Sequence, residues 1–214
     1  MKAAIFDLDG VLVDTAKYHF KAWAVLANEL GYTLTETKNE HLKGVSRVDS
    51  LKQILTWADV TISTDAFEAM LVAKNDHYLK LIEDVGPKDA LPGVHALLEA
   101  LKAHNIPIAL GSASKNARPI LDRLHITSFF DAIVDGNDVT QSKPDPEVFV
   151  KGAKALGISA DQCLVFEDSQ AGIEAALAAS MTPIAVGSAS VLSGGAFYVS
   201  DFETFPFARL AHLF

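Results

Sequence analysis

The sequence contains a single cysteine, Cys163, among its 214 residues, so it cannot form an internal disulfide bond. This cysteine usage is typical of proteins from a reducing compartment, and we expect the chain to be cytoplasmic. No apolar run approaches the roughly 18 residues that a membrane-spanning helix requires. Acidic residues follow the first short apolar run at Asp7 and Asp9, and this pattern argues against a secretory signal peptide.

Basic residues are also in the minority, since 18 lysines and arginines stand against 27 aspartates and glutamates, a net charge of −9. They are dispersed along the chain, so we expect it to bind neither nucleic acid nor an anionic membrane. The sequence has no P-loop and no G-x-G-x-x-G dinucleotide motif. Half of its residues are hydrophobic, which is enough to build a substantial core. Because no feature demands a partner chain, we expect a monomer.

Short apolar runs recur at wide spacing, and helical patterns separate most of them. Continuous apolar runs of this length are typical of strands that are buried on both faces. Strands that alternate with helices predict an α/β fold with a doubly wound parallel sheet and helices on both sides. The predicted strands lie at 3–6, 106–110, 132–134, 163–166 and 183–186.

The stretch from residue 16 to residue 86 breaks this alternation. Phe20, Trp23 and Leu30 share one face of an amphipathic helix, and two further helical stretches follow near 48–56 and 65–84. An ordinary crossover between two strands is much shorter, so we predict an inserted α-helical cap domain. The predicted domains are a catalytic core of residues 1–15 and 87–214 and a cap of residues 16–86.

Polar and charged residues follow four of the predicted strands at their carboxyl ends. Because these ends form the ligand crevice of an open parallel sheet, we expect the side chains to converge. Taken alone, an Asp-x-Asp pair can be a polar strand end with a helix cap, and each other element can be a loop, an exposed lysine or an N-cap. Four elements in order are difficult to explain in that way. They are Asp7 with Asp9, then Ser112, then Lys143, and finally Glu167 with Asp168.

The predicted crevice contains four carboxylates and one lysine. Converging carboxylates are strongly destabilising unless a cation or protons neutralise them. The expected ligands are all hard oxygens, with neither histidine nor cysteine among them, which favours Mg²⁺ over Zn²⁺. A divalent cation, Ser112 and Lys143 around one carboxylate suit phosphoryl transfer, in which the carboxylate itself can be the nucleophile.

The D-L-D-G-V segment at 7–11, the serine, the lysine and the E-D pair resemble the haloacid dehalogenase superfamily, and the resemblance spans the whole chain. It implies that Asp7 is the nucleophile and Asp9 the general acid and base, while Ser112 and Lys143 bind the transferring phosphoryl group. Members that cleave carbon–halogen bonds generally lack the second aspartate, so Asp9 favours phosphoryl chemistry. The implied ligands of one Mg²⁺ are Asp7, Asp168 and the backbone carbonyl of Asp9, with Glu167 close by.

A second motif, K-G-V-S-R at 43–47, lies between two predicted cap helices. Alone it can be a helix–helix turn capped by Ser46. Together with the S-K-N segment at 114–116 it resembles the β-phosphoglucomutase family, in which both segments bind the substrate's non-transferring phosphate. The resemblance further implies that His19 orients Asp9. The implied substrate-binding residues are Thr15, His19, Lys43, Gly44, Val45, Ser46, Arg47, Ser50, Lys74, Ala113, Ser114, Lys115 and Asn116.

This second resemblance implies a phosphomutase acting on β-D-glucose 1-phosphate and glucose 6-phosphate through an aspartyl phosphate. β-Glucose 1,6-bisphosphate would be both the intermediate and the primer. A mutase needs a transfer site and a distal anion site, and the planar guanidinium of Arg47 suits the second. A Mg²⁺-dependent sugar-phosphate phosphatase of the same fold is the alternative, and a catalytically silent sugar-phosphate sensor is a third interpretation.

Overall fold

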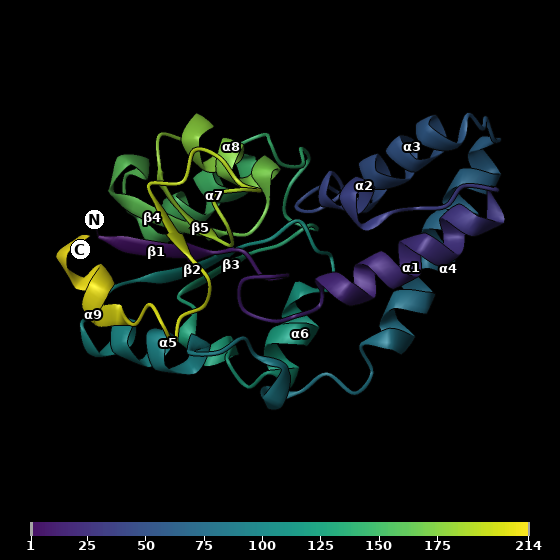
Figure 1. Ribbon diagram of the computed structural model, residues 1–214. Helices are drawn as coiled ribbons and strands as arrows, with labels where there is room; N and C mark the ends of the chain where they lie inside the picture. The colour runs from purple at the N-terminus through teal and green to yellow at the C-terminus, as the bar shows by residue number, and fades with distance from the viewer. Residues whose placement is uncertain (1, 214) are drawn as a thin grey trace.

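A six-stranded parallel sheet organises the computed structural model, which describes residues 2–213 (Figure 1). The strand order is β3-β2-β1-β4-β5-β6, so the order reverses beside β1. Ala4 pairs with Ile108 on one side and with Leu164 on the other. The predicted doubly wound α/β fold is therefore confirmed. The strands are β1 (Ala3–Phe6), β2 (Ile108–Gly111), β3 (Ala132–Val134), β4 (Cys163–Glu167), β5 (Thr182–Val186) and β6 (Phe197–Val199).

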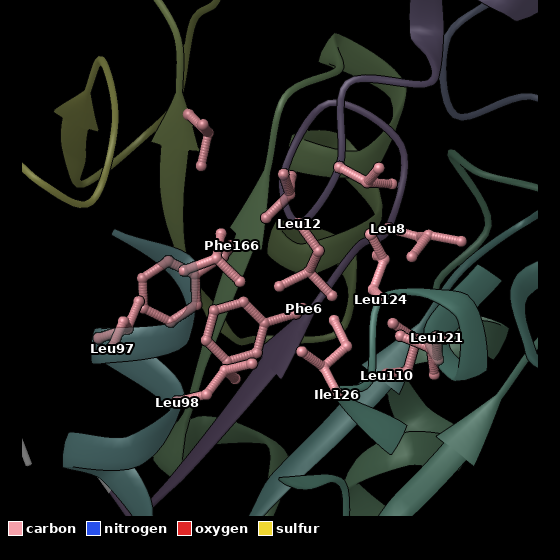
Figure 2. Packing of buried hydrophobic residues seen from close by; sticks show 14 of the residues in the cluster. Phe6, Leu8, Leu12, Leu97, Leu98, Leu110, Leu121, Leu124, Ile126 and Phe166 are labelled. Atoms are coloured by element: carbon pink, nitrogen blue, oxygen red, sulfur yellow. The ribbon is translucent and has the colours of Figure 1, made fainter. Parts of the chain in front are cut away.

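Helices cover both faces of this sheet, which is why the strands are apolar on both sides. In Figure 1, α7 and α8 lie on one face, and α5, α6 and α9 lie on the other. The rings of Phe6 and Phe166 stack 4.4 Å apart and pack with Leu97 and Leu98 of α5 (Figure 2). On the opposite face, Ile5 packs with Phe149 of α7. The helices are α5 (Val94–Ala103), α6 (Ala117–Arg123), α7 (Glu147–Leu156), α8 (Gln170–Ala178) and α9 (Phe207–Leu210), with single turns at Pro87–Asp89, Thr127–Phe129, Ala160–Gln162 and Ala211–Leu213.

The segment between β1 and the core helix α5 forms a helical cap beside one end of the sheet (Figure 1). It has an apolar cluster of its own, in which Trp23, Leu51 and Leu71 are buried. This is the predicted helical insertion, and its exact limits at residues 16 and 86 stay a prediction. Its helices are α1 (Ala16–Glu29), α2 (Glu36–Glu40), α3 (Arg47–Ala58) and α4 (Thr64–Leu81). Within residues 2–213, no helix combines the length and apolar character needed to cross a bilayer.

Candidate active site

Lys143 lies between two carboxylates at the carboxyl end of the sheet. Its Nζ is 2.6 Å from Oδ1 of Asp7, which follows β1, and 2.8 Å from Oε2 of Glu167, which ends β4. All three side chains are almost completely buried. Although burial alone would lower it, Asp7 and Glu167 raise the pKa of Lys143 above its usual value. Lys143 therefore keeps a positive charge beside the expected nucleophile.

The carboxylates outnumber this lysine. Burial raises the pKa of Asp7 to about 7 despite the opposing charge of Lys143, and burial followed by Glu167 raises the pKa of Asp168. Asp7, Glu167 and Asp168 offer carboxylate oxygens that all lie within 4.8 Å of one another. This crowded set of hard oxygen donors fits a divalent cation, which would relieve the excess negative charge.

Gly10 allows the chain to turn tightly after Asp9. Its φ is +88°, and a Cβ atom there would lie 2.1 Å from Oδ2 of Asp168. The turn closes with a hydrogen bond of 2.9 Å from the Gly10 N–H to the Val13 carbonyl. Only glycine combines this positive φ with so close an approach. The turn thereby brings the backbone next to Asp9 against Asp168, where the sequence predicts a metal.

Thr15, which directly precedes the cap, and His19 of the cap helix α1 hold the carboxylate of Asp9. The Thr15 hydroxyl donates a hydrogen bond to its Oδ1, and Nε2 of His19 lies 3.6 Å from the same oxygen. Burial alone would raise it, but His19 and the Thr15 hydrogen bond hold the pKa of Asp9 below its usual value. Asp9 is therefore ionised and can accept a proton from a substrate hydroxyl.

Lys74 of α4 lies behind His19 in an aromatic pocket. Its Nζ is 2.7 Å from Nδ1 of His19 and lies 4.6 Å and 5.0 Å from the ring centroids of Trp23 and Tyr78. The His19 and Tyr78 rings stack at 3.9 Å. Burial, reinforced by Arg47, lowers the pKa of Lys74 to about 7. The ammonium therefore lies close to its titration point at neutral pH.

Replacing Lys74 by methionine is expected to change how stability depends on pH. In the unfolded chain Lys74 keeps its proton up to about pH 10.5, whereas in the folded protein it loses it near pH 7. The stability of the parent therefore rises between these pH values, and that of Lys74→Met lacks this rise. We expect urea unfolding in metal-free buffer to show this change. The difference in the free energy of unfolding between the two proteins should change by about 2 kcal/mol or more from pH 6 to pH 9.5.

The matched control is Lys80→Met, at an exposed position of the same helix. Its difference from the parent should stay constant over that pH range. A constant difference for Lys74→Met as well would mean that Lys74 keeps an ordinary pKa in the folded protein.

A cavity of about 650 Å³ lies between the carboxyl ends of the strands and the cap. Most of the predicted residues line it, while Thr15 contacts Asp9, and Glu167 contacts Lys143. Asp168, which also does not line it, lies 3.7 Å from the Lys43 ammonium. The predicted residues in the wall are Asp7, Asp9, His19, Lys43, Gly44, Val45, Ser46, Arg47, Ser50, Lys74, Ser112, Ala113, Ser114, Lys115, Asn116 and Lys143. The wall also contains polar residues that the sequence analysis missed, including Asn39, Asp49, Asn75 and Ser142.

The loop after β2 is held by its own hydroxyls and by the turn after β3. The Ser112 hydroxyl accepts a hydrogen bond from the Ser114 N–H at 3.1 Å. The Gly136 N–H donates to the Ser114 carbonyl at 3.2 Å, and the Asn137 amide donates to the Lys115 carbonyl at the same distance. These bonds orient the S-K-N segment toward the cavity. Asn137 belongs to no recognised motif, so the sequence did not predict that it supports this segment.

Comparisons with known proteins show the family to which the chain belongs. A family model described as haloacid dehalogenase-like hydrolase matches residues 1–180, and the chain belongs to that family. The β-phosphoglucomutase of Bacillus subtilis (strain 168) is 42% identical over 196 residues, which are 91% of this chain and 87% of that protein.

A crystal structure of β-phosphoglucomutase from Clostridium difficile superposes with a TM-score of 0.95 at 38% identity, covering 100% of this chain and 96% of that one. A phosphorylated carbohydrates phosphatase of Thermotoga maritima is 32% identical over 187 residues, which are 86% of this chain and 84% of that protein. The proteins similar to this chain therefore include one named as a mutase and one named as a phosphatase.

Proposed function

We propose that the protein is a β-phosphoglucomutase, which interconverts β-D-glucose 1-phosphate and glucose 6-phosphate. The observation that supports the proposal is one cavity whose wall contains Asp7, Ser112 and Lys143 and also the cations Arg47 and Lys115. We assign one phosphate place to the first group of residues and a second phosphate place to the two cations. A mutase must hold a sugar bisphosphate by either phosphate while the other meets the nucleophile, and a cavity with both places suits that task.

In the proposed reaction, a carboxylate oxygen of Asp7 carries the phosphoryl group as an aspartyl phosphate. Asp9 removes the proton from the C6 hydroxyl of β-glucose 1-phosphate, and this oxygen attacks phosphorus as the bond to Asp7 breaks. The resulting β-glucose 1,6-bisphosphate reorients and returns its 1-phosphate to Asp7. Asp9 then protonates the leaving oxygen, and glucose 6-phosphate is released. Lys143 neutralises charge on the transferring group throughout.

We propose that Asp7, Asp168 and the backbone carbonyl of Asp9 hold one Mg²⁺, with Glu167 beside them. When bound, Mg²⁺ would supply positive charge that stabilises the transferring phosphoryl group. A small amount of β-glucose 1,6-bisphosphate is the expected primer. The protein would act as a cytoplasmic monomer on a small sugar phosphate. A closed cap would keep water from the aspartyl phosphate, so that a sugar hydroxyl reacts instead.

A Mg²⁺-dependent sugar-phosphate phosphatase is the second candidate, because the similar Thermotoga maritima protein is named as a phosphatase. Coupled detection of glucose 6-phosphate separates the two when inorganic phosphate is followed in the same tube. The assay contains β-glucose 1-phosphate as the substrate, Mg²⁺, and a trace of β-glucose 1,6-bisphosphate as the primer. Rapid glucose 6-phosphate formation with little phosphate release supports the mutase. Phosphate release without isomerisation would assign the protein to the phosphatases, and EDTA should stop either reaction.

A further inference from the structure

Asp49 links the cap to the core outside the expected catalytic groups. Its Oδ2 accepts a hydrogen bond of 2.6 Å from the Ser142 hydroxyl, 93 residues away in the sequence. The same oxygen accepts a hydrogen bond of 2.6 Å from the Ser46 hydroxyl. Hydrogen bonds to an ionised carboxylate are about twice as strong as those between neutral groups. The hydrogen bonds from Ser142 and Ser46 also hold the pKa of Asp49 below its usual value, so the carboxylate is charged at neutral pH.

Ser46 and Ser142, which both donate a hydrogen bond to Asp49, lie next to residues of the two proposed phosphate places. Ser46 caps α3 by accepting a hydrogen bond of 3.1 Å from the Asp49 N–H, and Arg47 is the first residue of that helix. Ser142 immediately precedes Lys143, whose ammonium contacts Asp7. The Asp49–Ser142 hydrogen bond therefore connects the start of α3, which carries Arg47, to the loop that carries Lys143.

The rest of the same cap loop also lies directly on the core. Gly44, at a φ of +70°, approaches Ser169 so closely that a Cβ atom would lie 2.4 Å from its hydroxyl oxygen. Lys43 lies 3.7 Å from Asp168, and the Asn116 amide donates to the Asn75 side chain at 3.1 Å. Removing the Asp49–Ser142 bond would leave these contacts in place. The closed cap would then be weakened but still formed.

We propose that Asp49 and Ser142 are positioning residues that hold the cap closed over the aspartyl phosphate and so favour a sugar hydroxyl over water as the acceptor. The inference rests on the proposed function. In both outcomes the bond between phosphorus and the Asp7 oxygen breaks. With the sugar, the new bond is to its hydroxyl oxygen and the proton goes to Asp9. With water, the products are free Asp7 and inorganic phosphate, and the proton leaves to solvent.

The test measures inorganic phosphate relative to glucose 6-phosphate in Ser142→Ala, Asp49→Ala and the double variant. We expect each single variant to raise this ratio about five- to tenfold, because a hydrogen bond to a charged group is lost. The double variant should match Asp49→Ala, because Asp49→Ala already removes this bond together with the contacts of Asp49 with Ser46 and Lys52. Ser190→Ala is the matched control. It removes an exposed hydroxyl whose hydrogen-bond partner, within residues 2–213, is the nearby Ser188 hydroxyl, so its ratio should equal that of the parent.

Hydrogen exchange gives a second readout that does not depend on turnover. With saturating glucose 6-phosphate and Mg²⁺, the amides of residues 43–49 should exchange faster in Ser142→Ala than in the parent or in Ser190→Ala. If the parent isomerises its substrate and the variants keep its ratio, this inference is wrong and the proposed function stands. If the ratio rises equally in Ser190→Ala, the inference is also wrong. If the parent releases only phosphate, both proposals fail.

Discussion

Replacing Asp7 by asparagine is expected to abolish phosphoryl transfer while leaving the protein as stable as the parent or more stable. An amide cannot form the aspartyl phosphate, so turnover should fall by about 10⁴-fold or more. The amide has almost the same size, so the packing around this buried position is kept. Lys143 retains its contact with Glu167 at 2.8 Å. The loss therefore concerns the reaction and leaves the fold intact.

The stability of Asp7→Asn depends on pH in a defined direction. Burial raises the pKa of Asp7 to about 7, against 3.8 in the unfolded chain. The folded parent binds more protons between these values, so its stability falls as pH rises through that window. The variant lacks this decline. In metal-free buffer, the amount by which its free energy of unfolding exceeds that of the parent should therefore grow from about pH 4 to pH 7.

Urea unfolding at pH 4.5 and pH 7.5, together with the coupled assay, checks both expectations for Asp7→Asn. Asp161→Asn, at an exposed position, is the matched control and should change neither quantity. Turnover of Asp7→Asn within about 100-fold of the parent would show that another group is the nucleophile. A variant less stable than the parent at pH 7.5 would show that the ionised carboxylate is stabilising.

The pattern located five of the six described strands to within two residues at either end, including the edge strand β3. The strand β1 (Ala3–Phe6) matches its apolar run fully, because helices cover it on either side. The run that begins at Ile106 forms a strand only from Ile108, since the Ile106 N–H bonds to the Leu101 carbonyl in the turn after α5. The strand β6 was not predicted. It has three residues at the sheet edge, and Tyr198 at its centre is exposed.

In the candidate site, the sequence predicted the groups that come at strand ends, where topology alone brings them together. The contacts that support these groups could not be predicted from the sequence. Tyr78 stacks on His19 across 59 positions, and Ser142 reaches Asp49 across 93. The first pair depends on how α1 packs against α4 within the cap, and the second depends on how the cap meets the core; no local spacing encodes either. The short helix α2 (Glu36–Glu40) was missed for a different reason, because its five residues are all polar and so show no helical hydrophobic periodicity.

Replacing Lys143 by methionine is expected to lose activity and stability together, unlike Asp7→Asn. Methionine fills a similar volume but leaves Asp7 and Glu167 buried without their cation. Removing one partner of a buried ion pair typically costs about 3–5 kcal/mol, because the remaining charge is uncompensated. Turnover should fall by about 10²- to 10³-fold or more, since no ammonium neutralises the transferring phosphoryl group.

Two conditions should restore the stability of Lys143→Met but not its turnover. Lowering the pH protonates the orphaned carboxylates, so the free-energy difference from the parent should be smaller at pH 5 than at pH 8. Adding Mg²⁺ at pH 8 should also reduce it, because a cation that binds only the folded protein stabilises that state. Urea unfolding with EDTA or Mg²⁺ measures both effects, and Lys151→Met, on the exposed face of α7, is the control. A Lys143→Met protein as stable as the parent in EDTA at pH 8 would mean that the carboxylates do not depend on this lysine for their charge balance.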